Sequence, residues 1–274
     1  MTTIETGTDH LLASVDEGVG TLTLNRPERR NALSHEMVEA LGRAIPLLDE
    51  DPEVGCLVIT GAGGAFCSGG DVLDFHDSGG EGGGADEIDP TAVAEQLEHQ
   101  KLTVGALYRA RTPVVASLPG AAAGAGLGLA LAADLRVGSA RALMVTAFAS
   151  VGLSGDFGVA WLLQRLVGPA KARELLFLNP RVDAQAAADL GLLDRLCTEQ
   201  ELSAATTTLA RRLADGPRGA LAAIKQNLVD AADQTLEDSM AAEIRRHKAC
   251  GITADHIAAV AAFAAKQKAV FNRS

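Results

Sequence analysis

The chain has 274 residues, of which 47% are hydrophobic and 22% are charged, a balance typical of a globular protein rather than a disordered or fibrous one. A chain of this length buries about 73% of the surface that its unfolded form exposes, so it can form a sizeable core. Its 24 basic side chains against 35 acidic ones give a net charge of −11, which repels nucleic acid phosphates and anionic lipids. We therefore expect neither a nucleic acid nor a membrane as a partner.

The four cysteines lie far apart and form no CxxC pair, which favours free thiols in a reducing compartment. Residues 1–18 carry acidic side chains where a secretory signal needs a basic region and an apolar run. Both features predict a cytoplasmic protein. The uncharged run 113–133 has the length of a membrane span, but Pro113 and Pro119 interrupt it, and we expect a strand, a turn and a helix there instead.

The N-terminal part predicts a hairpin followed by a helix. Alternating apolar residues at 11–15 and 20–24 flank a turn that contains glycine, which is typical of two paired antiparallel strands. A loop is expected over 25–33. Ser34 then precedes apolar residues at helical spacing, so it is the expected N-cap of a helix over 35–48.

Strands and helices alternate in the middle of the chain, and twice a strand leads through a Gly-rich turn to the start of a helix. This alternation indicates an α/β fold. The predicted elements are, in chain order, a strand at 56–60, a Gly-rich turn at 61–75, a helix at 91–110, a strand at 114–118, a small-residue helix up to 133 and a strand at 134–138.

The last part of the chain is expected to be mostly helical. Helices are predicted at 159–166, 170–176 and 184–190, and long amphipathic stretches occupy the remainder. The composition changes near residue 200 without a Pro- or Ser-rich linker. We therefore divide the chain into a core region, 1–200, and a helical C-terminal region, 201–274.

The two Gly-rich turns are the most informative segments; the first is 61–75, and the second lies between the strand at 114–118 and the small-residue helix. Neither fits the dinucleotide pattern GxGxxG, because Phe66 and Leu131 stand where a third small residue is required, and no Gly-Lys-Ser or Gly-Lys-Thr phosphate loop occurs. A Gly-rich turn before a helix can present free backbone N–H groups to an anion or to a developing oxyanion. It can equally serve only to let a strand and a helix pack closely. These residues alone do not decide between the two.

Four segments in order along the chain carry a resemblance to a known family. They are LNRPERRNALS (24–34), AFCSGGD (65–71), PVVASLPGAAAGAGLGLALAADLRV (113–137) and AFAAKQKAVF (262–271). Together they resemble the enoyl-CoA hydratase/isomerase, or crotonase, superfamily over nearly the whole chain. The resemblance implies a crotonase-like α/β spiral of β-β-α turns with a helical C-terminal trimerisation region, and hence a homotrimer or hexamer.

The resemblance also implies chemistry on acyl-CoA thioesters. Coenzyme A is then part of the substrate, and neither a metal ion nor a redox cofactor is expected. In this family paired backbone N–H groups stabilise the oxyanion of a thioester enolate, and by similarity these donors are Gly70 and Ala125. Such donors are worth about 3 to 4 kcal/mol each when they are held in place in a dry site.

The coenzyme A site implied by the family combines residues of two subunits. An acidic protein needs local positive charge to hold a polyanionic ligand, and the loop 25–33 carries a basic cluster that includes Arg26. By similarity the binding residues are Glu28, Arg29, Arg30 and the backbone around Ser68, with Phe263 and Lys266 supplied by the C-terminus of a neighbouring subunit.

The chain departs from the family at the catalytic carboxylates. Hydratases of the family use two glutamates to activate water and protonate carbon, but Gly128 and Phe148 stand at those positions. Neither side chain can transfer a proton. At Asp156 the chain resembles the isomerases of the phenylacetate pathway and the 4-chlorobenzoyl-CoA dehalogenases, which have an aspartate there. A single carboxylate can move a proton between two carbons of an enoyl thioester once N–H donors hold the enolate oxygen.

Four alternatives remain beside an isomerase that uses Asp156 as its acid and base. Asp156 precedes a predicted helix, so its side chain can simply be an N-cap. Asp156 alone can recruit water in a hydratase, or attack the substrate as in a dehalogenase. Without both glutamates, the chain can also be a family member that binds acyl-CoA without turning it over.

Two further groups of residues are candidates for a site. Asp74, His76 and Asp77 are spaced like metal ligands, but no His or Cys cluster completes a ligand shell, so no metal is expected. Three aromatic side chains are candidates to line an acyl pocket, although most such residues belong to the core. These are Phe75, Phe148 and Trp161.

Overall fold

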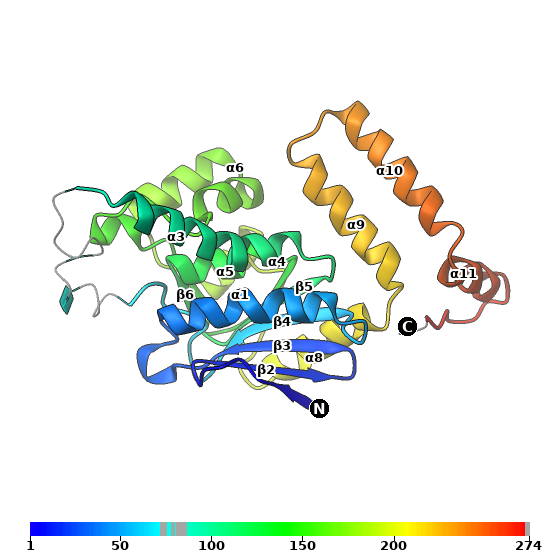
Figure 1. The fold of residues 1–274 in the computed structure, drawn as a ribbon, viewed down its shortest axis with the longest axis horizontal. Helices are drawn as coiled ribbons and strands as arrows, with labels where there is room; N and C mark the ends of the chain where they lie inside the picture. Colours follow the sequence, from blue (N-terminus) through cyan, green and yellow to red (C-terminus); the bar gives the residue numbers. More distant parts are fainter. Residues whose placement is uncertain (72–75, 78–79, 81–86, 272–274) are drawn as a thin grey trace.

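The computed structural model describes residues 1–71, 76–77, 80 and 87–271, and a seven-stranded sheet forms its centre (Figure 1). The strands lie in the order β1-β2-β3-β4-β5-β7-β10; β1, β2 and β3 pair antiparallel and the later neighbours pair parallel. Their bounds are Thr2–Ile4 (β1), Leu11–Asp16 (β2), Val19–Leu24 (β3), Cys56–Gly61 (β4), Val114–Leu118 (β5), Leu135–Ser139 (β7) and Arg195–Cys197 (β10). The predicted hairpin and the three predicted strands are confirmed.

A second ladder of short strands accompanies the large sheet. It contains β6 (Ala121–Ala123), β8 (Leu143–Val145) and β9 (Val182–Asp183). Isolated bridges pair Leu33 with Gly70 and Cys67 with Ala122, so the ladder continues through both Gly-rich turns. A sheet strand, a ladder strand and a helix thus repeat along the chain, which confirms the spiral of β-β-α turns. The sequence did not predict the ladder, because runs such as three alanines lack the β-branched and aromatic residues typical of strands.

Helices cover both faces of the large sheet. Leu57 and Ile59 of β4 join the main core with α1 and α5, whereas Cys56 and Val58, which alternate with them, join a smaller core beneath α8. The helix bounds are His35–Glu50 (α1), Pro90–Gln100 (α3), Ala106–Arg109 (α4), Ala125–Ala132 (α5), Val159–Leu178 (α6), Ala184–Asp189 (α7) and Leu202–Ala214 (α8).

The predicted helices are confirmed with two refinements. Ser34 caps α1, because its Oγ accepts a hydrogen bond from the N–H of Met37 at 3.2 Å. The helix predicted at 91–110 contains one turn of π-helix, Lys101–Gly105, between α3 and α4. The two helices predicted at 159–176 are merged in α6, but Gly168 has φ 76° and ψ 161°, so the backbone still bends there.

The C-terminal helices divide into one that packs on the sheet and three that stand away from it. α8 contacts β4, β5 and β7, so the packing groups it with the core, while the division of the chain at residue 200 stays a prediction. α9 (Arg218–Ala231) and α10 (Leu236–Cys250) form a helical hairpin beside the body of the molecule, with α11 (Ala254–Ala264) at its far end (Figure 1). We call α9–α11 the arm.

The arm is joined to the body by the buried Lys225 and by Arg218, and it exposes many apolar side chains. The ammonium group of Lys225, which is buried, lies 2.7 Å from a carboxylate oxygen of Asp134 and also donates to the carbonyls of Leu107 and Thr112. The large apolar side chains that the arm exposes are Ile224, Leu228, Leu236, Met240, Ile244, Ile252, Ile257, Val260 and Phe263. Within the described part of the chain, no helix is both long enough and apolar enough to span a bilayer.

Candidate active site

The first Gly-rich turn is bonded to the loop that precedes α1. The N–H of Leu33 donates to the carbonyl of Gly69 at 2.8 Å, and the N–H of Ser68 donates to the carbonyl of Arg30 at 3.1 Å. Both contacts are backbone to backbone. The loop therefore positions the turn in part through main-chain hydrogen bonds.

Two buried polar side chains reinforce this junction. The side-chain amide of Asn31, which is fully buried, donates to the carbonyls of Ala62 and Ala65, both at 2.9 Å. Asp71 ends the turn, and its carboxylate lies 3.2 Å from a guanidinium nitrogen of Arg26; both side chains are largely buried. Removing one partner of a buried ion pair costs about 3 to 5 kcal/mol, so this pair fixes the turn to the loop.

The two Gly-rich turns meet so closely that side chains do not fit between them. A Cβ on Gly69, whose φ is +92°, would lie 2.8 Å from the carbonyl oxygen of Ala123 and 3.3 Å from the amide nitrogen of Ala125. A Cβ on Gly126 would lie 2.5 Å from the carbonyl oxygen of Cys67. The sequence analysis gave close packing and the presentation of backbone N–H groups as alternative roles of the glycines. In the structure the same contact combines close packing with neighbouring backbone N–H groups.

Gly70 and Ala125, the predicted oxyanion donors, lie on adjacent parts of this contact. Ala125 is the first residue of α5, where backbone N–H groups lack partners within the helix and the helix dipole adds partial positive charge. Within the described residues, neither the Gly70 nor the Ala125 N–H has a hydrogen-bond acceptor. Two such N–H groups can donate hydrogen bonds to an oxygen that gains negative charge during a reaction.

Four of the six residues predicted to contact coenzyme A lie beside the first turn. Glu28, Arg29 and Arg30 are exposed on and after a short 3-10 helix, and the Ser68 hydroxyl donates to the carbonyl of Arg29 at 3.3 Å. The other two, Phe263 and Lys266, lie on α11 and just after it, on the opposite side of the molecule (Figure 1). Phe263 is 85% exposed. Within one chain they do not join the site.

Cys67 lies inside the first turn but is not a candidate nucleophile. Complete burial raises the pKa of its thiol to about 12, so the reactive thiolate is absent near neutral pH. All four cysteines are free. Cys67 therefore supplies no reactive thiolate to the turn.

At the two positions where the family's hydratases have glutamates, this chain has Gly128 and Phe148, and both residues are closely packed. A Cβ on Gly128 would lie 2.6 Å from the carbonyl oxygen of Phe157. The ring of Phe148 is buried and lies 3.8 Å from where a Cβ on Gly124 would stand. The segment around residue 157 consequently packs directly on α5, one helical turn after Ala125.

Asp156 is held by hydrogen bonds from another helix and does not cap α6. Gln96 Nε2 donates to Oδ2 of Asp156 at 2.8 Å, and Gln100 Nε2 donates to Oδ1 at 2.5 Å. Oδ1 also accepts from the N–H of Phe157 at 2.8 Å. The N-cap of α6 is Gly158, and no side chain caps the helix, so the N-cap interpretation of Asp156 is wrong.

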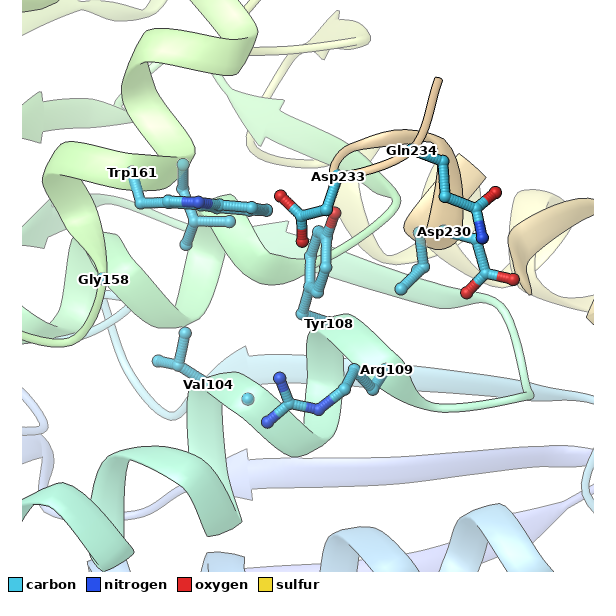
Figure 2. A pocket seen from close by; sticks show the side chains of 11 residues that line it. Val104, Tyr108, Arg109, Gly158, Trp161, Asp230, Asp233 and Gln234 are labelled. Atoms are coloured by element: carbon cyan, nitrogen blue, oxygen red, sulfur yellow. The ribbon is translucent and has the colours of Figure 1, made fainter. Parts of the chain in front are cut away.

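A cavity of about 430 Å³ opens next to this segment (Figure 2). Val104 and Tyr108 approach it from the α3–α4 side, Trp161 and Leu162 from α6, and Asp233 from the end of α9. The rings of Tyr108 and Trp161 meet edge to face, with centroids 5.1 Å apart. Gly158, two residues after Asp156, is part of the wall. Val104, Tyr108, Trp161 and Leu162 form an apolar and aromatic part of the lining. Charged and polar groups are added by Arg109, Asp230, Asp233 and Gln234.

Comparison of the sequence with protein-family models shows the family to which the chain belongs. The sequence model of the family described as enoyl-CoA hydratase/isomerase matches residues 14–274. The chain belongs to this family. The enoyl-CoA hydratase/isomerase resemblance of the sequence is thereby confirmed, and an acyl-CoA substrate is consistent with the membership.

Relatives in this family carry names of both reactions. The chain is 34% identical to the 1,2-epoxyphenylacetyl-CoA isomerase of Escherichia coli K12, with 96% of this chain and 98% of the relative covered. It is 31% identical to the trans-2-decenoyl-[acyl-carrier-protein] isomerase of Streptococcus mutans, with 95% and 97% covered. The crystal structure of an enoyl-CoA hydratase from Polaromonas matches with a TM-score of 0.87, 32% identity, and 94% and 98% covered.

Some candidate residues lie outside the described part, and others were missed. Asp74 and Phe75 are outside it, and His76 and Asp77 are exposed. Sequence reasoning missed Gln96 and Gln100 and placed Arg26 only in a basic cluster. The ion pair of Arg26 and Asp71 could have been expected from the sequence, because an acidic residue in the Gly-rich segment follows a loop that contains a basic residue. No local signal pointed to the glutamines.

Proposed function

We propose that this member of the enoyl-CoA hydratase/isomerase family shifts the double bond of an enoyl-CoA, with Asp156 as the acid and base. The observation that carries the proposal is the placement of the Asp156 carboxylate. It is held by two amides on a segment that packs against α5, and α5 begins at the proposed oxyanion donor Ala125. No cofactor beyond the coenzyme A of the substrate takes part.

The proposed reaction moves one proton. The Asp156 carboxylate removes a proton from C2 of a 3-enoyl thioester, and the C–H electron pair enters the conjugated system while negative charge gathers on the thioester oxygen. The N–H groups of Gly70 and Ala125 stabilise this oxygen. The dienolate then takes the proton back from Asp156 at C4, which gives the conjugated 2-enoyl thioester and regenerates the carboxylate.

The cavity that opens at Gly158, two residues after Asp156, supports a place for the acyl group. Its wall includes aromatic and aliphatic side chains, which suit a hydrocarbon chain or ring, and also the polar groups of Arg109, Asp230, Asp233 and Gln234. Trp161 lines this cavity, as proposed from the sequence, and Phe148 lies near the second turn instead. We propose that the acyl group passes Asp156 and ends against Trp161.

The arm supports a homotrimeric or hexameric assembly. Its apolar surface is the kind of surface that interfaces cover. In such an assembly Phe263 and Lys266 of one subunit would contact coenzyme A bound to its neighbour, which is consistent with their distance from the site of their own chain (Figure 1). The cytoplasmic location stays a prediction.

Asp156→Asn tests the proposed reaction. We expect the rate of 3-enoyl-CoA isomerisation to fall about 10²- to 10⁴-fold, which is the usual contribution of a general acid and base, while the Kd for coenzyme A changes less than about twofold. The assay follows the absorbance of the conjugated thioester. The matched control is Asp189→Asn, an exposed aspartate of α7 whose partner is Gln185.

The same assay separates the alternatives. A hydratase would deplete the conjugated absorbance of 2-enoyl-CoA in water, and a binding protein would change neither substrate. Either result, or unchanged turnover in Asp156→Asn, contradicts the proposal.

A further inference from the structure

Two glutamines of α3 are bonded to the carboxylate of Asp156, although they lie 56 and 60 residues away in the sequence. Gln100 Nε2 donates to Oδ1 and Gln96 Nε2 donates to Oδ2, so each carboxylate oxygen receives one side-chain amide. We propose that Gln96 and Gln100 are positioning residues that orient Asp156 for proton transfer. This inference rests on the proposed function of Asp156.

The helical spacing explains why both amides reach the same carboxylate. Residues four apart in an α-helix lie on one face, so Gln96 and Gln100 project together from the last turn of α3. Farther along the continuous helical segment that α3 and α4 form, Val104 and Tyr108 face α6 and line the cavity. One side of α3–α4 therefore changes from polar, where it faces Asp156, to apolar, where it faces the proposed acyl site.

The backbone at the C-terminal end of α3, which carries these amides, is held in place by buried residues that follow it. Thr103, in the π-helical turn that follows, is fully buried, and its hydroxyl donates to the carbonyl of His99 at 2.6 Å. Leu107 is also fully buried. Long glutamine side chains gain precision when the backbone that carries them is fixed, because fewer rotamers then satisfy the hydrogen bonds.

The chemistry of the amide group suits a carboxylate that gains and loses a proton. Hydrogen bonds donated to a carboxylate favour its ionised form, which is the form that removes a proton from carbon. A side-chain amide also contains an acceptor, so a rotation about its last bond lets its oxygen accept a bond from a protonated carboxyl. The amide itself carries no charge and does not compete for the substrate proton. Glutamine thus fits both halves of the proposed cycle.

Gln96→Met and Gln100→Met test the inference, since methionine keeps the length of the side chain and removes the amide. We expect kcat to fall about 10- to 100-fold in each, because a misplaced catalytic group costs that much, while KM stays within about threefold. Gln185→Met is the matched control, because Gln185 is an exposed glutamine that bonds to an aspartate four residues away on α7. We expect it to have the kcat of the unchanged protein.

A second measurement distinguishes orientation of Asp156 from a purely structural bond between α3 and the 156–158 segment. In D2O, a well-oriented carboxylate returns the substrate proton to C4 before it exchanges with solvent. We expect the fraction of product with deuterium at C4 to rise in both glutamine variants and not in the control. Gln100→Asn, which keeps the amide but shortens the side chain by one methylene, is expected to show the same loss of kcat and the same rise.

The outcomes keep this inference separate from the proposed function. If Asp156→Asn loses turnover while both glutamine variants keep their kcat and their deuterium fraction, the positioning role is wrong and the proposed base stands. The positioning role is also wrong, with the base unaffected, if kcat falls in the glutamine variants without a rise in the deuterium fraction. If Asp156→Asn keeps its turnover, the proposed base is wrong, and the positioning role is wrong with it.

Discussion

The two Gly-rich turns and the arm are built from opposite kinds of residue. Where the turns meet, Gly69 and Gly126 bring backbone atoms so close that an added Cβ would overlap main-chain oxygen. In the arm, large apolar side chains such as Leu228 and Ile244 stand exposed. The turns are therefore completed by contacts within the chain, whereas the arm has apolar area that its own chain leaves uncovered.

This difference predicts how each region responds to substitution. At the turns, the smallest added side chain disturbs the backbone itself, because the neighbouring atoms are main chain and cannot rotate away. The exposed apolar side chains of the arm project outward, so substituting one of them changes what the surface can bind and leaves the packed body unchanged.

The largest effect is expected when a Cβ is added to the contact between the turns. In Gly126→Ala the new methyl would lie 2.5 Å from the carbonyl oxygen of Cys67, so α5 must shift. We expect about 1 to 3 kcal/mol of lost stability, a Tm lower by roughly 2 to 4 °C per kcal/mol, and a loss of kcat of about 100-fold. Calorimetry and steady-state kinetics measure both.

The arm supplies the matched control for that substitution. Gly219 lies within α9, and a Cβ there would have no heavy atom within 4 Å. Gly219→Ala should raise stability by about 0.5 to 1 kcal/mol, because alanine restricts the unfolded chain and favours the helix. Equal losses of Tm in both variants would remove the distinction between the two regions.

The next effect concerns assembly. Introducing charge by Leu228→Glu together with Ile244→Glu should reduce the oligomer to smaller species, since burying an unpaired carboxylate at an interface is unfavourable. Sedimentation equilibrium measures the mass, and circular dichroism checks that the body remains folded. Lys248→Glu places the same charge on an exposed polar position of α10 and should leave the mass unchanged. A monomer before any substitution would contradict the proposed assembly.

A smaller effect is expected where the body and the arm meet. Trp161 lines the cavity between α4, α6 and α9, so Trp161→Ala should enlarge the proposed acyl site. We expect the ratio of kcat/KM for long over short acyl chains to change by about 10-fold in favour of longer chains. Phe177→Ala removes an exposed aromatic ring of the same helix outside the cavity and should leave that ratio unchanged.

The smallest effect is expected at the far end of the arm. Phe263→Ala should raise KM about fivefold with kcat unchanged, which corresponds to roughly 1 kcal/mol of lost binding by a residue on a neighbouring subunit. Val260→Ala, an equally apolar change on the same helix, is the control. An unchanged KM in Phe263→Ala would contradict the contribution of α11 to the coenzyme A site.

Local sequence patterns predicted much of the fold and part of the site. The hairpin, α1 with its Ser34 cap, β4 and β5 follow from alternation, helical spacing and capping, all of which act over a few residues. The resemblance to the family supplied the spiral and the candidate site residues. The Gly-rich turns were recognised from their composition, but their contact with each other was not visible in it.

The remaining features depend on contacts between distant parts of the chain. Gln96 and Gln100 have the appearance of polar residues on the solvent face of a helix, and only the fold brings Asp156 to them. α8 is amphipathic like the arm helices, but periodicity does not say which surface an apolar face will cover. The π-helical turn after α3 likewise has no local sequence signature that we recognised.

The contact between Gly128 and Phe157 limits how this chain could acquire a new reaction. The main chain of Phe157 occupies the space that any side chain at position 128 would need. The single substitution Gly128→Glu would therefore clash with the segment that carries Asp156. Engineering two-carboxylate chemistry onto this scaffold therefore requires a shift of the segment around Phe157 together with the change at position 128.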